Sequence, residues 1–305
     1  MKKLFVYLIA LSVLLPTTMV ATNSTPQKPP KITRPSKPTS KPNVRPRTPA
    51  KPSHRQSSQS SSATSQRVNP APISVTGAKT FTVNGVNFTM VPVEVGTFQM
   101  GSTTGYSDEK PVHTVTLSSY YIGQTEVTQA LWKAVMGSNP SNFKGDNLPV
   151  ENISWNDCQK FITKLNQLTG KTFRLPTEAE WEFAARGGNR SQGYQYSGSN
   201  TLGDVAWYYD NSSGKTHPVA QKQANELGIY DMSGNVLEWC QDWYGSYSSS
   251  AQSNPTGPTS ESYRVRRGGS WRYYAGGCRP AYRNDDIRHP GISGDDLGLR
   301  LVLSE

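Results

Sequence analysis

The stretch RLPTEAEWEFAARGG, residues 174–188, carries the clearest local signal for the fold. Thr177 and Glu180 have the spacing of a capping box, in which each side chain satisfies a backbone N–H group at the start of a helix. Gly187 is well placed to end that helix, because glycine readily takes the left-handed conformation. The three glutamates between them suggest acid/base chemistry, but carboxylates are also favoured at the positive end of a helix dipole. The stretch therefore predicts a short capped helix and not a catalytic group.

Two longer helices are predicted before this stretch. One covers Thr128 to Met136 and stops at Gly137. The other runs from about Trp155 to Leu168, with an N-cap at Ser154 and Gly170 beyond its end. Its apolar residues fall on one helical face: Cys158, Phe161, Ile162, Leu165 and Leu168.

Three runs with strand-like alternation precede the helices, over residues 81–93, 96–102 and 113–123. After Gly188 the chain is dense in Gly, Ser, Asn and aromatic residues, and it predicts few long elements. We expect buried tryptophans, side-chain-to-backbone hydrogen bonds and bound ions to hold this half. The composition indicates an irregular α+β domain.

The N-terminal quarter of the chain has a different composition. Residues 1–72 contain no Asp or Glu, and they hold twelve of the 32 Lys and Arg, which leaves 20 basic against 22 acidic residues in the remainder. The net charge of +10 therefore belongs to this quarter, which argues against a nucleic-acid-binding surface on the domain.

Three parts of the chain follow from this composition. Residues 1–21 have the basic start, apolar stretch and small-residue end of a signal peptide, with an uncleaved anchor as the alternative. Residues 22–79 form a basic linker rich in Pro, Ser and Lys, predicted to be disordered. Residues 80–305 form the domain. We expect a secreted, periplasmic or cell-surface protein with no transmembrane span after signal cleavage.

Cys158, Cys240 and Cys278 are the only cysteines, and their spacing matches no zinc site. One disulfide and one buried thiol is the simplest arrangement in an oxidising compartment. Because Cys158 lies on the apolar face of a predicted helix, we expect a Cys240–Cys278 disulfide. The four histidines show no paired spacing, so no transition-metal site is predicted from them.

Seven stretches, in order, resemble the formylglycine-generating enzyme or sulfatase-modifying factor family. They are MVPVEVGTFQMGS, PVHTVTLSSYYIGQTEVT, PVENISWNDC, RLPTEAEWEFAARGG, GIYDMSGNVLEW, RGGSW and DLGLR, within about 225 residues. The resemblance implies an irregular α+β, C-type-lectin-like fold with little regular secondary structure. Fold alone does not settle function, since a large branch of this family lacks oxidase activity.

The resemblance also bears on catalysis. The active oxidases hold copper with two cysteines spaced C-x4-C shortly after the GGS turn, because paired thiolates suit Cu(I). Counted from Ser270, the second cysteine position is Cys278 and the first is Tyr273. A phenol is a poor ligand for Cu(I), so the resemblance argues against oxidase activity. Cys278 remains the only candidate catalytic residue.

Calcium is a better-supported cofactor by the same resemblance. In GIYDMSGNVLEW the family's calcium loop would use the side chains of Asp231 and Glu238 and the carbonyls of Gly234 and Val236. A second family site would use another set of oxygen donors, namely Asp204, the Val205 carbonyl, Asn211 and the Ser213 carbonyl. The alternative is that these loops are turns with unrelated acids.

The segment 271–296 departs most from the family. On a constant frame, the places where relatives usually carry asparagine hold Tyr, Gly, Asp, Ile, His and Ser, all reachable from an asparagine codon by changing adenines. That pattern resembles the variable region made by diversity-generating retroelements, which use this fold to bind ligands, although ordinary divergence of a surface loop is the alternative. The predicted ligand-binding residues are Tyr273, Tyr274, Asp285, Asp286, Ile287, His289, Ile292, Asp295 and Asp296.

Three functions stay open. The first is a secreted, non-catalytic protein that binds a protein or glycan at a cell surface through residues 271–296. The second is a copper-dependent oxidase that converts a sulfatase cysteine to formylglycine. The third is a structural component of a cell-envelope complex, tethered by the basic linker.

Overall fold

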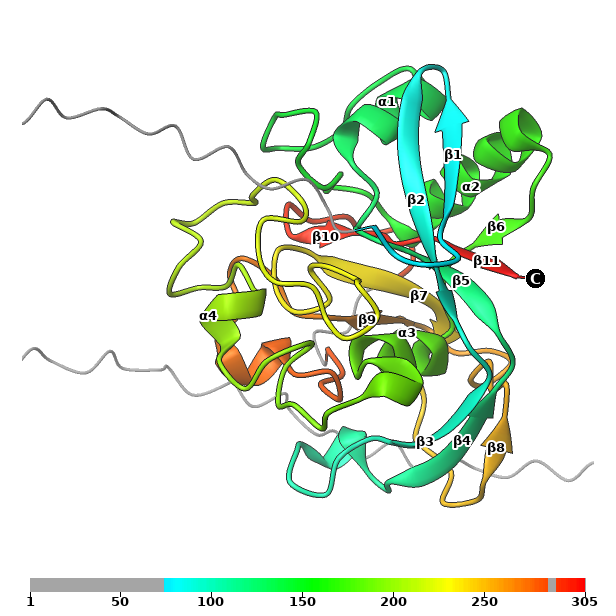
Figure 1. The fold of residues 1–305 in the computed structure, drawn as a ribbon, viewed down its shortest axis with the longest axis vertical. Coiled ribbons are helices and arrows are strands. Elements are labelled where there is room, and N and C mark those ends of the chain that lie inside the picture. The colour runs from blue at the N-terminus through cyan, green and yellow to red at the C-terminus, as the bar shows by residue number, and fades with distance from the viewer. Residues whose placement is uncertain (1–73, 285–288, 305) are drawn as a thin grey trace, which may run out of the picture. The chain divides into compact units, whose positions relative to one another are not determined.

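The computed structural model describes residues 74–284 and 289–304. The largest sheet in this part has the strand order β1-β2-β5-β11-β6, with antiparallel neighbours throughout (Figure 1). Its strands are β1 (Lys79–Val83), β2 (Val86–Val93), β5 (Tyr120–Gly123), β6 (Phe173–Arg174) and β11 (Val302–Ser304). The last strand of the chain thus lies between two earlier ones, which ties the C-terminal segment to the start of the domain.

Two three-stranded sheets complete the strand content of the described residues. One has the order β3-β4-β8 and the other β10-β7-β9, and each contains one parallel pair. Their strands are β3 (Gly96–Met100), β4 (His113–Leu117), β8 (Gln252–Ser253), β7 (Leu237–Trp243), β9 (Arg264–Arg267) and β10 (Leu297–Gly298). The three strand-like runs of the sequence correspond to β1 through β5.

The three predicted helices are present, and the structure adds one short α-helix and three 3-10 helices to them. The α-helices are α1 (Gln129–Met136), α2 (Trp155–Thr169), α3 (Glu178–Ala185) and α4 (Leu202–Val205). The 3-10 helices are η1 (Ser107–Glu109), η2 (Gly188–Arg190) and η3 (Ala275–Cys278). The hydroxyls of Thr128, Ser154 and Thr177 each accept a hydrogen bond from a backbone N–H of the first turn. Gly187 follows α3 with φ of 90°.

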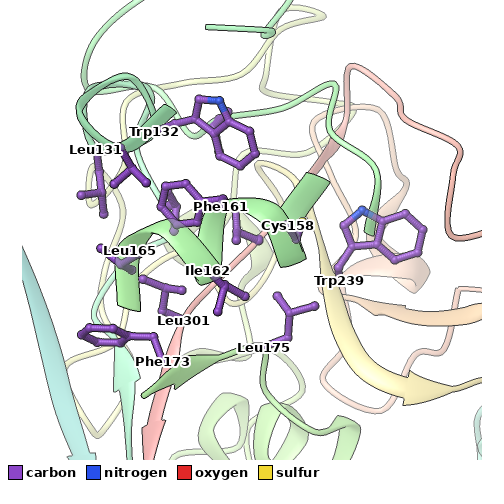
Figure 2. Packing of buried hydrophobic residues seen from close by; sticks show 14 of the residues in the cluster. Leu131, Trp132, Cys158, Phe161, Ile162, Leu165, Phe173, Leu175, Trp239 and Leu301 are labelled. Atoms are coloured by element: carbon purple, nitrogen blue, oxygen red, sulfur yellow. The ribbon is translucent and has the colours of Figure 1, made fainter. Parts of the chain in front are cut away.

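The apolar face of α2 packs into the larger of two main hydrophobic clusters (Figure 2). Phe161 stacks on Trp132 of α1 with ring centroids 4.8 Å apart, and Cys158 and Leu165 are fully buried beside it. Leu168, predicted on the same face, is instead 53% exposed. The prediction fails there because the packed surface ends one turn before the helix does.

Helix α3 is buried along its whole length, as no other helix of the described residues is. It lies beside β7 and β9 and contributes Trp181 and Phe183 to the second cluster. Three of its eight residues are glutamates, so its burial requires buried cations. Arg174 and Arg186 flank the helix and supply two of these cations, and Arg267 and Arg283 supply the others.

Candidate functional site

The segment after β9 begins with a turn that only glycine can form. Gly268 and Gly269 have φ of 98° and 71°. A Cβ atom on Gly269 would lie 2.6 Å from the carbonyl oxygen of Gly277 and 2.8 Å from Sγ of Cys278. The missing side chain therefore lets η3 pack directly against the turn.

Buried arginines hold the frame of this segment in place. Arg283 donates to Glu178 of α3 through Nε and Nη2, at 2.7 and 3.0 Å. Arg300 donates to Glu238 of β7, with Nη2 2.7 Å from Oε1. Three pairs have both side chains buried, namely Arg267–Glu182 at the end of β9 and Arg283–Glu178 and Arg300–Glu238 within the segment. A buried charge is costly unless it is paired, so each pair fixes the segment on α3 or β7.

The predicted explanation of the α3 glutamates was therefore incomplete. Helix-start chemistry holds for Glu180, whose carboxylate accepts the backbone N–H of Thr177 at 2.8 Å. The same carboxylate also binds Arg174, at 2.6 Å. Glu178 and Glu182 act as counter-ions for the frame arginines. The sequence signal for this role is a pair of arginines, Arg267 in RVRRGGSW and Arg283 directly after CRPAY.

Between these frame residues, several predicted ligand-binding side chains face outward. Tyr274 is 65% exposed, and its ring lies against that of Tyr209, with centroids 4.5 Å apart. Tyr209 is itself 54% exposed and comes from the loop after α4, outside the predicted segment. Ile292 is 48% exposed, and His289 is exposed as well. We call the contacting pair of Tyr209 and Tyr274 the tyrosine face.

Other predicted contact residues point inward. Tyr273 is half-buried, and its hydroxyl accepts a hydrogen bond from Nδ2 of Asn284 at 2.5 Å. Asp295 pairs with Arg272. Asp296 is only 3% exposed and accepts from Oγ of Ser270 at 3.2 Å, so its prediction as a surface contact is wrong. The Asp296 carboxylate is buried because it binds the Ser270 side chain at the turn. Asp285, Asp286 and Ile287 lie outside the described residues.

The predicted Cys240–Cys278 disulfide does not form. All three cysteines are free and buried. Cys158 lies in the cluster around α2, Cys240 in the cluster around α3, and Cys278 in a third, smaller cluster. Sequence spacing could not reveal this separation.

The surroundings of Cys278 are apolar. Burial raises the pKa of its thiol to about 12, which keeps it protonated near neutral pH. Tyr273, at the other family copper position, packs against the same small cluster. The pair thus offers one thiol and one phenol that is hydrogen-bonded to Asn284. This donor set does not fit Cu(I), which favours thiolates.

The predicted calcium loop brings three carboxylates together. Asp231 accepts the backbone N–H of Ala220 at 2.7 Å through Oδ2, while its Oδ1 is buried with no hydrogen-bond partner among the described residues. Glu238 is engaged by Arg300, and also by Nε1 of Trp181 at 2.7 Å. Glu126, absent from the predicted set, accepts from Nδ2 of Asn235 at 3.1 Å.

The carboxylates of this loop disfavour one another's ionisation. Burial, followed by the charges of Asp231 and Glu238, raises the pKa of Glu126. Burial also raises the pKa of Asp231 to about 6. Arg300 supplies one positive charge against three acids. The free oxygen of Asp231 fits an additional oxygen-binding cation, although within the described chain no three His, Cys, Asp or Glu side chains are arranged as a metal site.

The second predicted calcium set is less well assembled. Asn211 accepts the backbone N–H of Tyr208 through Oδ1 at 2.8 Å and donates to the carbonyl of Ala206 at 2.9 Å. Asp204 accepts from Oγ of Ser199 at 3.1 Å. Both side chains thus already have partners nearby, and the site, which also includes Val205 and Ser213, stays a prediction.

Comparison with known proteins assigns the chain to a family. The sulfatase-modifying factor enzyme 1-like domain matches residues 77–305. The chain belongs to this family. A formylglycine-generating enzyme of Streptomyces coelicolor is 31% identical over 67% of the chain and 86% of its own length. The chaperone protein LppX of Paenibacillus barcinonensis is 37% identical over 71% of the chain and 89% of its own length.

The chain is also similar to a protein of known structure. Treponema denticola variable protein 1 is 38% identical, with a TM-score of 0.70 over 75% of the chain and 99% of that protein. The predicted fold class, an irregular α+β fold of the sulfatase-modifying-factor and C-type-lectin-like kind, is confirmed.

Proposed function

We propose that this sulfatase-modifying-factor domain is a secreted, non-catalytic protein that binds a protein or glycan ligand through the tyrosine face. The observation that carries the proposal is the division of residues 271–300 into buried frame and exposed positions. Arg283 and Arg300 of this segment pair with buried glutamates, whereas Tyr274 and Ile292 contact solvent. Outward side chains can then vary without disturbing the buried ion pairs.

The chemistry of the exposed positions suits recognition. Tyrosine offers a rigid amphipathic contact area at low entropic cost, and small polar residues around it adapt to the ligand. Tyr209 supports Tyr274 from outside the segment, which pre-orders part of the surface before binding. The likeness to Treponema denticola variable protein 1 also supports a variable binding surface, and retroelement diversification is our proposed source of its residues.

The proposed location rests on the N-terminal quarter. A signal peptide at residues 1–21 would direct export, and the basic linker would favour an anionic envelope surface. In the described part of the chain, no helix is long and apolar enough to cross a membrane.

The test uses full-length exported protein on an array of glycans and surface proteins, followed by affinity measurements on each hit. Tyr274→Ala and Tyr209→Ala should each weaken binding by about 1–3 kcal/mol, roughly 5- to 150-fold, if the two rings anchor the ligand. Tyr263→Ala is the control, since Tyr263 is 37% exposed and lies before β9. Equal affinities for all three variants would reject the tyrosine face.

The oxidase function is the second candidate, supported by the identity with the Streptomyces coelicolor enzyme. It would require Cys278 to act without a second thiolate, at a position where burial raises the thiol pKa to about 12. Incubation with Cu(I), oxygen and a sulfatase-motif peptide distinguishes the two functions. A peptide aldehyde detected by mass spectrometry, and lost in Cys278→Ser, would replace the binding function with catalysis.

A further inference from the structure

A separate cavity lies where the C-terminal end of β7 meets the start of α3. Its volume is about 340 Å³. Its polar wall contains Asp242 and Glu178, and its apolar wall contains Trp243, Tyr247 and Pro258. The stretch from residue 245 to residue 258, which follows β7 and includes β8, lines one side of the cavity. No residue of the tyrosine face lines it.

Most charges around this cavity are already neutralised. Glu178 is bound by Arg283, and it also accepts from the Tyr247 hydroxyl at 3.2 Å. Arg283 in turn donates to the carbonyls of Asp108 and Gly245, at 3.1 and 2.9 Å. Its guanidinium lies 4.2 Å from the ring centroid of Tyr247. Neither group of this pair is left to bind a charged ligand.

Asp242 is different. Its carboxyl accepts the backbone N–H of Glu178 at 2.9 Å through Oδ2, and no Lys or Arg of the described residues forms an ion pair with it. It is 4% exposed. Burial and then the charge of Glu178 raise its pKa to about 8. The Asp242 carboxyl therefore has no cationic side chain paired with it. Because Asp242 lines the cavity, a cationic ligand in the cavity could reach it.

The walls favour an organic cation over a bare ion. Trp243 and Tyr247 line the cavity, and each ring already has an arginine over one face, Arg264 at 3.4 Å and Arg283 at 4.2 Å from the ring centroids. The rings therefore offer apolar contact area to the hydrocarbon part of a ligand, and Asp242 offers the negative charge. Pro258 adds apolar area for a hydrocarbon body. We propose that this cavity binds a small organic ammonium, with Asp242 as its counter-ion and the aromatic wall around its apolar part. The inference is independent of the proposed function of the tyrosine face.

Titration calorimetry of the full-length protein with benzylamine, and with benzyl alcohol as the uncharged analogue, tests this site. Benzylamine should bind at least about tenfold more tightly than benzyl alcohol. In Asp242→Asn this preference should disappear, whereas the amide oxygen can still accept the Glu178 N–H and preserve the fold. Glu94→Gln, at an exposed acid on the loop after β2, is the matched control and should keep the preference.

Proton release gives an independent measure. Because Asp242 is mostly protonated at pH 7, ammonium binding should release close to one proton per site, detected by repeating the titration in buffers of different ionisation enthalpy. Binding should strengthen between pH 6 and 8 and then level off. The other charged or titratable groups near Asp242 are Glu178, Glu180, Cys240, Arg174, Arg264, Arg283, His113 and Tyr247. The Asp242→Asn variant separates their titration from that of Asp242.

Thr256→Trp covers the case in which Asp242→Asn does not fold. Thr256 is exposed on the cavity wall, and an indole there should fill the space and abolish benzylamine binding.

N-acetyl-lysine methylamide serves as a second probe, because a lysine of a partner protein carries the same ammonium. Tighter binding of this probe would assign the site to a protein lysine, and tighter binding of benzylamine to a free amine. Equal affinity for benzylamine and benzyl alcohol, or unchanged binding in Thr256→Trp, would overturn the proposal.

Discussion

Single buried arginines determine where the C-terminal segment lies. Arg300 is fully buried, and its guanidinium also donates to the carbonyls of Gly123 and Tyr230, both at 2.9 Å. One side chain therefore joins β5, β7 and the loop before the predicted calcium site. An uncharged side chain cannot replace Arg300, because the Glu238 carboxylate would then be buried without its cationic partner.

Replacing Arg300 with methionine should destabilise the domain by about 3–5 kcal/mol, the usual cost of breaking a buried pair. Urea unfolding followed by tryptophan fluorescence measures the change. Arg190→Met is the control, since Arg190 is exposed, and it should change stability by less than about 0.5 kcal/mol. A loss below 1 kcal/mol for Arg300→Met would contradict the role given to the buried pair.

At the scale of elements, the loop 228–236 before β7 connects the sheets through its backbone. Gly234 has φ of 82°, and a Cβ there would lie 2.3 Å from the carbonyl oxygen of Trp207. Asn235 follows with φ of 57° and bonds both Glu126 and the backbone at His217. This tight loop gathers Glu126, Asp231 and Glu238 around one arginine, and we propose that calcium offsets their excess negative charge.

Calcium bound only by the folded loop should stabilise it, by about 2.7 kcal/mol when its free concentration is a hundred times Kd. Adding a chelator should therefore lower the melting temperature measured by calorimetry. Asp231→Asn should remove this calcium dependence, whereas Asp210→Asn, at an exposed acid, should retain it. An identical melting curve with and without chelator in the unmodified protein would refute the calcium site.

At the scale of the whole molecule, the described residues form three hydrophobic clusters instead of the single core expected of a domain this size. Each contains one of the three cysteines, and the buried arginine–glutamate pairs link α3 and β7 to the segment around the smallest cluster. Stability therefore rests on packing and buried ion pairs, with no covalent cross-link among the cysteines.

Because all three cysteines are free, the number of reactive thiols in the unfolded protein can be predicted. Protein unfolded in denaturant without reductant should titrate three thiols with Ellman's reagent, and the melting temperature of the native protein should not change when reductant is added. Native protein should react slowly, because all three thiols are buried. A count of one thiol would instead show that two of the cysteines form a disulfide.

The sequence alone determined those features that depend on neighbouring residues. Thr177 and Glu180 are three residues apart, and their spacing predicted the start of α3, as Ser154 did for α2. The seven quoted stretches predicted the family and its irregular fold. These signals are readable because a cap or turn involves only a few consecutive residues.

Only the tertiary structure decided features that join distant residues. Glu178 and Arg283 are 105 positions apart, and Tyr209 supports Tyr274 from a different loop. It likewise separated Cys240 from Cys278 and buried Asp296. In an irregular fold no repeating hydrogen-bond pattern relates such residues, so long-range packing alone determines which charges pair and which side chains face solvent.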